Sequence, residues 1–258
     1  MQLPVRLVET QRLLRGESSL FPTVDWIAKN LAAKIADCLS QYANESQEMT
    51  RTFLQRVLRT NGGGPSPEDI RVRVRSVQAE LERLSALGLL RAGDEVPSSP
   101  VTDQEIEGAD SGRLAMLTQY VADQEVALKA FRHLADRLQI LEKALASKFD
   151  DKVIRPAQGE GLIATNKNGV RVPLSALSSG EQHILVLFYE LLFLAPEGTL
   201  VLIDEPEISM HILWQKEMVE DIVRIAAIAK LDVVMATHSP YIAGERSDLM
   251  VPMRAGAA

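Results

Sequence analysis

The sequence of 258 residues has one cysteine, no long apolar run and no recognisable secretory signal, and each absence excludes a class of protein. Cys38 is the only cysteine, which excludes a disulfide scaffold because it has no partner within the chain. The most apolar run, residues 184–194, contains Glu190 and is about half as long as the roughly 20 residues that a membrane span needs. The N-terminus has no basic segment followed by an apolar one, so it carries no recognisable secretory signal. We therefore expect a cytoplasmic protein that does not enter a membrane.

Neither sign of charge is in large excess, with 28 Lys+Arg, 35 Asp+Glu and a net charge of −7. A hydrophobic fraction of 46% is ordinary for a globular protein and argues against disorder. The negative charge argues against a broad nucleic-acid surface, so a DNA contact would need a local basic patch. The densest basic cluster is Arg71, Arg73 and Arg75 with Arg83. A solvated helix face explains this cluster, and contact with the phosphate backbone of DNA is the second interpretation.

Residues 1–150 predict a mainly helical region. Apolar residues recur at three- and four-residue steps from Val24 to about Arg59. The glycine- and proline-rich residues 61–67 break this pattern. A second helix is predicted to begin at the cap Ser66, with Pro67 in its first position, and to stop near Gly88. Residues 92–112 contain acidic residues, two prolines and no Lys or Arg, which predicts an acidic loop or a flexible tip.

A long helix is predicted from Arg113 to Phe149, with apolar residues near heptad spacing. It has two interpretations, a helix packed in an antiparallel bundle or a short coiled-coil arm that projects from a head domain. Gln124 and Ala135 interrupt the apolar seam, and both interpretations stay open.

The pattern changes at residue 150. Two short strands are predicted on either side of the turn Asn166–Gly169, followed by a helix over 179–194, a strand over 199–203, a helix over 212–230 and a strand over 232–237. Apolar strands that alternate with helices predict an α/β fold with a buried, largely parallel sheet. We expect a helical arm in residues 1–150, with loops near 61–67 and 92–112, and an α/β lobe in residues 151–258.

Two carboxylates, Asp204 and Glu205, follow the apolar strand over 199–203. They are expected at the carboxyl end of the strand, where ligands bind in open α/β sheets. Asp204 suits a phosphate-bound Mg²⁺, which prefers hard oxygen ligands and usually keeps its waters. Glu205 is placed to polarise an attacking water. The alternative is a strand that simply ends in polar residues at a turn.

Two further motifs flank these carboxylates in the sequence. Residues 177–182, Leu-Ser-Ser-Gly-Glu-Gln, precede an apolar helix and could form an anion site, in which Ser178 donates and Gly180 lets backbone N–H groups approach. The same residues form a capping-box pattern between Ser178 and Glu181, which is the favoured interpretation of this motif alone. His238 follows the last predicted strand and could reach a phosphate or the attacking water, although a lone histidine there is more often structural.

The order LSSGEQ, LVLIDEPE, ATHSP resembles the signature, Walker B and His-switch motifs of the ABC-type ATPases. The continuation through residues 207–211 is most similar to bacterial AAA-type predicted ATPases related to OLD proteins and SMC-type heads, and residues 5–14 and 42–58 also resemble segments of these proteins. The resemblance implies a P-loop NTPase-type, ABC-like fold that binds ATP and Mg²⁺. Asp204 would hold Mg²⁺, Glu205 would be the general base and His238 would sense the γ-phosphate.

The resemblance also implies a homodimer with ATP sandwiched between protomers. Ser178, Ser179, Gly180 and Glu181 would contact the ATP bound to the facing protomer, and His211 would lie in a segment at the dimer interface. Hydrolysis would drive a conformational change, with DNA repair, phage defence or toxin-like activity as the cellular role.

The sequence departs from this family in one large respect. It contains no G-x-x-x-x-G-K-[ST] motif and no Gly-Lys dipeptide, and the stretch Gly62–Gly64 lacks both the lysine and a preceding strand. The chain therefore resembles the C-terminal half of such an ATPase. We expect an N-terminal P-loop half or a partner chain to complete it, and no ATP hydrolysis by this chain alone.

Two functions stay open. In the first, ATP is hydrolysed at a site to which this chain contributes the carboxylates, the histidine and the signature. In the second, the chain is a non-catalytic interaction or regulatory module with a vestigial ATPase lobe. The intact motif residues favour the first, and the missing P-loop favours the second.

Overall fold

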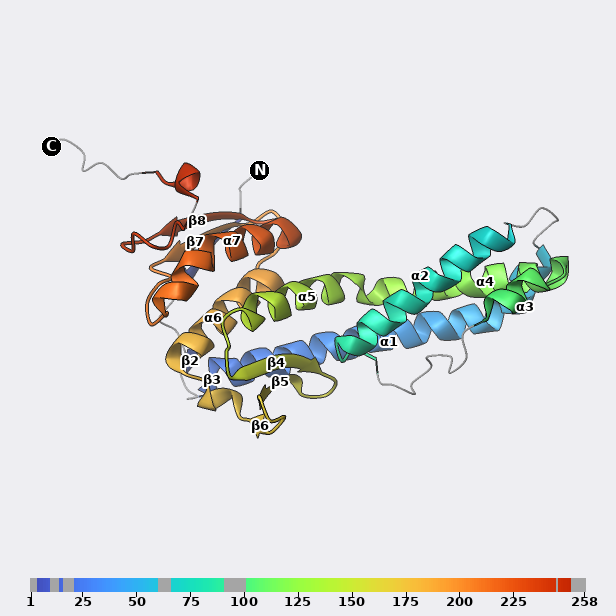
Figure 1. The fold of residues 1–258 in the computed structure, drawn as a ribbon, viewed down its shortest axis with the longest axis horizontal. Coiled ribbons are helices and arrows are strands. Elements are labelled where there is room, and N and C mark those ends of the chain that lie inside the picture. Colours follow the sequence, from blue (N-terminus) through green and yellow to red (C-terminus); the bar gives the residue numbers. More distant parts are fainter. Residues whose placement is uncertain are drawn as a thin grey trace. The chain divides into compact units, whose positions relative to one another are not determined.

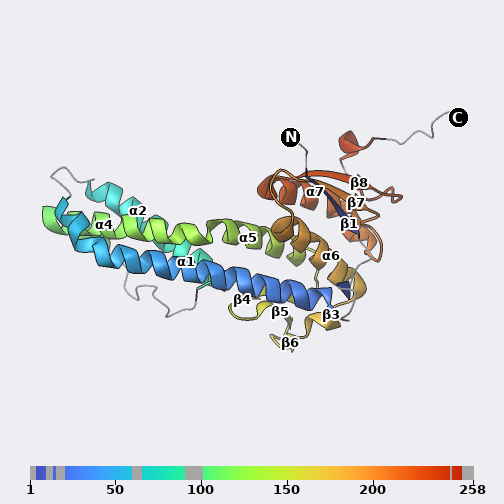
Figure 2. The same cartoon turned by 180° about the vertical axis from the view of Figure 1, so that it is seen from behind.

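The computed structural model describes residues 4–9, 14–15, 21–59, 66–90, 101–244 and 246–251. The chain divides into two compact units (Figures 1 and 2). The sheet unit comprises Met1–Asn30, Asp136–Arg155 and Leu162–Ala258, and the helical unit comprises Leu31–Ala135 and Pro156–Gly161. The sheet unit thus includes residues from both ends of the region 1–150, and the division of the chain into an arm and an ATPase lobe stays a prediction.

The helical unit is built from the predicted amphipathic helices. It contains most of α1 (Thr23–Arg59), with α2 (Pro67–Ala86), α3 (Asp103–Glu107) and α4 (Ser111–Ala127). The predicted start of α2 is confirmed, because Ser66 and Asp69 form a capping box and Pro67 is the first helical residue. Gly88 follows the helix with a φ of 68°, in the left-handed region that favours glycine. The buried side of α2 packs against α4 through a stripe at helical spacing: Ile70, Val74, Val77, Leu81 and Leu84.

Two predictions for the helical region need correction. The acidic stretch 92–112 is not wholly a loop, because Thr102 caps the short helix α3 through a capping box with Glu105. The helix predicted over residues 113–149 is divided by a 3₁₀ turn, Leu128–Phe131, into α4 and α5 (Arg132–Ala146). The predicted loop at 61–65 and residues 92–100 lie outside the described residues.

The sheet unit contains the predicted parallel sheet. Its three strands have the order β1 (Val5–Glu9), β7 (Leu200–Asp204) and β8 (Asp232–Ala236), all parallel. The helices α6 (Ser179–Tyr189) and α7 (Ile212–Ala229) follow the expected positions, and α6 continues into a π turn, Glu190–Leu194. In Figures 1 and 2, α7 lies along one face of this sheet. The β7–α7–β8 order is the right environment for a ligand site at the carboxyl edge of the sheet.

The remaining strands are short. β4 (Lys152–Ala157), β5 (Gly161–Asn166) and β6 (Arg171–Val172) form a second sheet in that order, and β2 (Leu14–Arg15) pairs antiparallel with β3 (Phe21–Pro22). The predicted hairpin is confirmed, since β5 and β6 are antiparallel and Gly169 in their turn has a φ of 76°. No helix in the described part of the chain is both long enough and apolar enough to cross a membrane.

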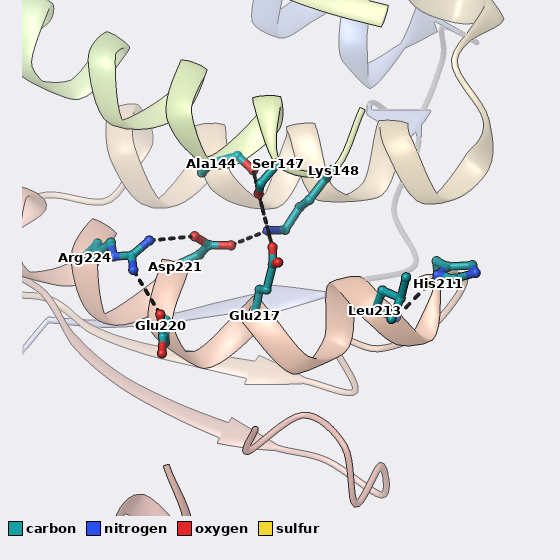
Figure 3. Close-up of polar contacts among 9 residues, drawn as sticks. All are labelled: Ala144, Ser147, Lys148, His211, Leu213, Glu217, Glu220, Asp221 and Arg224. Atoms are coloured by element: carbon teal, nitrogen blue, oxygen red, sulfur yellow. Dashed lines mark hydrogen bonds and ion pairs between the residues drawn. The ribbon is translucent and has the colours of Figure 1, made fainter. Parts of the chain in front are cut away.

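A buried lysine anchors the end of α5 to α7 (Figure 3). The Lys148 side chain is 0% exposed and donates to the carboxylate of Asp221 and, at 3.0 Å, to Glu217 Oε2. Arg224 adds a second positive charge 3.7 Å from Asp221 and also contacts Glu220 at 2.9 Å. Because Lys148 is buried, these carboxylates are needed to offset the cost of removing its charge from water.

Candidate functional site

Three of the predicted site residues meet at the carboxyl edge of the parallel sheet. Asp204 ends β7 as an exposed residue, and Glu205 N donates to Ala236 O at 2.9 Å, which extends the pairing with β8 by one step. His238 follows β8, and its Nε2 atom lies 3.6 Å from Glu205 Oε1. Parallel strands end at the same edge of a sheet, so this register brings all three residues to one edge, with the Glu205 carboxylate beside the His238 imidazole.

The backbone at Glu205 is held in a costly conformation. Its φ is 46°, in the left-handed region, where a non-glycine residue costs of order 1–3 kcal/mol. Ile208 N donates to Glu205 O at 3.2 Å and Met210 N donates to Glu207 O at 3.0 Å, so residues 205–210 form a tight hydrogen-bonded turn. We call this segment the β7 turn. Its bonds hold the Glu205 carboxylate at the sheet edge.

The N-terminus of α6 packs directly on the β7 turn. A Cβ atom at Gly180 would lie 2.5 Å from Ser209 O and 3.4 Å from the ring of Trp214, so only glycine fits here. The buried His183 places Nδ1 2.8 Å from Ile208 O, which makes Nδ1 the protonated nitrogen. Burial lowers the pKa of His183, and the bond to Ile208 O opposes this only in part. The LSSGEQ stretch is thus joined to the segment that carries Glu205.

The capping-box interpretation of LSSGEQ is confirmed. Glu181 N donates to Ser178 Oγ at 3.3 Å, and Ser178 N donates to Glu181 Oε2 at 2.7 Å. Lys152 Nζ contacts both Glu181 oxygens, at 2.8 and 2.9 Å. Burial alone would raise the pKa of Glu181, but these hydrogen bonds outweigh it and the pKa is lowered. Glu181 is therefore a buried carboxylate with internal partners, whereas Ser178 and Ser179 are exposed; nucleotide contact by this stretch stays a prediction.

The Asp204 carboxylate is suited to bind a Mg²⁺ ion that arrives with a nucleotide. Within the described ranges, no three or more His, Cys, Asp or Glu side chains are grouped to enclose a metal ion. A Mg²⁺ that arrives with a nucleotide needs few protein ligands, because phosphate oxygens and waters fill most of its octahedron. The exposed carboxylate of Asp204, at the end of a parallel strand, fits that requirement.

The structure adds Glu207, which sequence reasoning did not single out. Its Oε1 atom accepts from Thr237 Oγ1 at 2.7 Å, His238 N at 2.9 Å and Ser239 N at 3.0 Å. The available signal was a third carboxylate in Asp-Glu-Pro-Glu together with the donor-rich Thr-His-Ser after the next strand. Their contact depends on how two loops approach, which the spacing does not show.

His211 and the basic cluster take structural roles. His211 Nδ1 caps α7 by accepting from Leu213 N at 3.3 Å (Figure 3), and an interface role for it stays a prediction. The four arginines all have carboxylate partners in the helical unit: Arg71 pairs with Glu68, Asp103 and Glu107, Arg73 with Glu125, Arg75 with Asp103, and Arg83 with Glu80. The carboxylates in these pairs balance the positive charge of the arginines, so less of that charge is left to bind DNA phosphates. This favours the solvated-face interpretation.

Comparison with known proteins gives one family match. The model of the family described as "AAA domain, putative AbiEii toxin, Type IV TA system" matches residues 66–244. No curated protein matches the sequence.

Proposed function

Since the match over residues 66–244 covers more than half of the chain, the chain belongs to this family of AAA domains, and we propose that it binds and hydrolyses ATP as part of a composite site. In this proposal the chain corresponds to the C-terminal half of an ABC-like, OLD-related ATPase. A P-loop half, on the same or a separate polypeptide, supplies the cradle for the α- and β-phosphates.

The observation that carries the proposal is the pairing of Glu205 with His238 beside Asp204. Glu205 would take the proton from the attacking water as general base. His238, with its imidazole 91% exposed and 3.6 Å from Glu205, is free to meet a γ-phosphate from the solvent side. Asp204 would hold Mg²⁺ through water, and Mg²⁺ when bound neutralises charge on the phosphate oxygens.

Among the described residues, one face of the parallel sheet is uncovered, and this supports the proposal that a further half of the ATPase packs there. Register places Leu7, Leu202 and Val234 in one row across the three strands. Leu7 and Val234 are 58% and 56% exposed, and Val5, two residues from Leu7, is 59% exposed. Parallel sheets are normally covered on both faces. We propose that the P-loop half covers this face, because the 258 residues contain no Gly-Lys dipeptide to form a phosphate loop of their own.

The exposed Ser178 and Ser179 at the N-terminus of α6 would meet ATP held by a second copy of the chain. The positive end of the α6 dipole favours an anion there. In this proposal the chain forms a homodimer with two sandwiched nucleotides. The helical unit would serve as the arm that hydrolysis moves, and DNA repair or phage defence in the cytoplasm is the proposed setting.

The test is ATP hydrolysis by purified protein. The chain would be assayed alone and together with a polypeptide that carries a G-x-x-x-x-G-K-[ST] motif and is encoded directly upstream. We expect no turnover alone and clear turnover by the complex. Glu205→Gln in the complex is expected to lower kcat by about 100-fold or more while ATP still binds, because a general base contributes about 10²–10⁴-fold.

The matched control is Glu220→Gln, which removes an exposed α7 carboxylate paired with Arg224 and should leave turnover unchanged. Rapid hydrolysis by the isolated chain would overturn the composite site. Unchanged kcat in Glu205→Gln would overturn the role of Glu205. ATP binding without hydrolysis by the complex would favour the non-catalytic interaction module.

A further inference from the structure

Glu207 connects the two loops that carry the proposed catalytic groups. It lies in the β7 turn, two residues after Glu205, and all three donors to its Oε1 come from Thr237–Ser239 after β8. The other carboxylate oxygen, Oε2, is buried and has no hydrogen-bond partner among the described residues. One carboxylate oxygen therefore gathers a hydroxyl and two consecutive backbone N–H groups.

The imidazole of His238 depends on this backbone for its position. It is 91% exposed, and its 3.6 Å separation from Glu205 is longer than a hydrogen bond. In the described part of the chain no hydrogen bond restrains the ring itself. Its placement is set by the main chain at 238, whose N–H, with that of Ser239, is bound to Glu207.

The segment Thr237–Ser239 is tied down on two further sides. Ser239 N also contacts Thr237 Oγ1 at 3.0 Å, and Ser239 Oγ donates to Gln215 Oε1 of α7 at 2.7 Å. Gln215 Nε2 in turn donates to Met210 O, at the end of the β7 turn, at 3.2 Å. Glu207 is the member of this network with a negative charge, and charge-assisted hydrogen bonds are about twice as strong as neutral ones.

We propose that Glu207 is a positioning residue, which fixes the main chain at Thr237–Ser239 and thereby holds the His238 imidazole beside the Glu205 carboxylate. The catalytic consequence rests on the proposed function, whereas the positioning itself does not. Glu207 does not face the nucleotide in this assignment, because its bonded oxygen is turned toward the loop after β8.

Hydrogen exchange of the free chain, without ATP, tests the positioning directly. The amides of His238 and Ser239 are expected to exchange at least about tenfold faster in Glu207→Ala, because their acceptor is removed. Glu207→Gln retains an acceptor oxygen and should show a smaller increase. Glu205→Gln is the matched control, since it changes a neighbouring carboxylate but leaves these hydrogen bonds in place, and its exchange should equal that of the wild type.

If Glu207→Ala does not fold, as judged by circular dichroism, Thr237→Val takes its place. That variant removes one donor to Glu207 and one acceptor of Ser239 N while it keeps the side-chain shape. The expected result is then a larger increase in exchange rate, relative to the wild type, at the Ser239 amide than at a remote α7 amide. Unchanged exchange in the folded variants would overturn the inference whatever their ATPase activity.

Turnover by the complex with a P-loop polypeptide gives the second readout. Glu207→Ala should lower kcat by about tenfold or more with little change in the KM for ATP, and Glu207→Gln should restore part of it. Faster exchange with an unchanged kcat would support the positioning of the main chain and overturn its catalytic consequence. If the wild-type complex hydrolyses no ATP, the proposed function fails and the exchange measurement alone decides the inference.

Discussion

At the residue scale, Gly180 shows that a glycine in a motif can be required by packing. A Cβ there would lie 2.5 Å from Ser209 O, a backbone atom in a turn that is itself constrained. The glycine is needed for close packing of α6 on the β7 turn, independently of any approach by an anion. The adjacent capping box fixes where α6 begins, so the first turn of the helix has little freedom to retreat.

Gly180→Ala is expected to destabilise the chain by about 1–3 kcal/mol, because an extra methyl group must displace backbone. Urea unfolding followed by circular dichroism measures the difference. Gly112→Ala is the control, since its Cβ would meet only the Asp110 side chain at 3.4 Å in the first turn of α4. Equal unfolding free energies of the two variants would show that the backbone of the β7 turn can shift at little cost to accommodate the methyl group.

His183 gives a prediction of pH dependence at the same scale. Burial lowers its pKa from the ordinary 6.5, and the bond to Ile208 O only partly restores it. The neutral imidazole is therefore favoured by folding, so its stability contribution is present above about pH 6.5 and is lost as the pH falls through the lower folded pKa.

We expect His183→Gln to lose less unfolding free energy than the wild type between about pH 7 and pH 5. The glutamine amide can still donate to Ile208 O. Denaturant titrations at several pH values would measure the slope, with the exposed His133→Gln as control. Parallel slopes for His183→Gln and the wild type would refute the assignment.

At the scale of elements, local patterns predict most of the helices and two of the three strands of the parallel sheet, β7 and β8. The helices α1, α2, α6 and α7 have strong periodicity or clear caps, and β7 and β8 are short apolar runs. β1 is expected only as a segment shared with related ATPases, because Arg6 and Glu9 leave it without the continuous apolar run of β7, and its pairing with β7 far along the chain has no local signal.

The heptad pattern does not predict the break between α4 and α5. Leu128 and Phe131, at the two ends of the 3₁₀ turn, are both buried, but residues three apart share one side of an α-helix as well as of a 3₁₀ turn, so their spacing favours neither. The candidate site shows the same limit. Asp204, Glu205 and His238 were predicted because each follows a strand, whereas Glu207 was not, because its role arises where two loops meet.

The anchor of α5 on α7 gives the prediction at this scale. Lys148→Met is expected to cost about 3–5 kcal/mol, because it leaves Asp221 buried with Arg224, 3.7 Å away, as its remaining cationic partner among the described residues. The double variant Lys148→Met/Asp221→Leu should recover most of this loss, since an apolar pair of similar size needs no compensation. A double-mutant cycle by urea unfolding measures the coupling, and additive losses would contradict a buried ion pair.

At the scale of the whole molecule, the feature that bears on the proposed function is the face of the sheet unit that no described residue covers. Leu7, Val5 and Val234 are aligned by register on one side of β1, β7 and β8, and the sheet has parallel strands throughout. Such a face is costly in water, and in the proposed function it is the surface that another polypeptide layer covers. The proposed P-loop half is the partner whose chemistry this chain lacks.

Leu7→Lys/Val234→Lys is therefore expected to weaken binding of the P-loop polypeptide by about 100-fold or more, because two ammonium groups would be buried without partners. Both side chains are exposed in the chain itself, so its unfolding free energy should barely change. Calorimetric titration measures the affinity, and the turnover of the complex should fall in step with its occupancy. Leu54→Lys/Leu58→Lys, at two exposed α1 positions in the helical unit, is the matched control. If both double variants bind the P-loop polypeptide as tightly as the wild type does, the partner covers neither surface, and the composite site must be assembled without the sheet face.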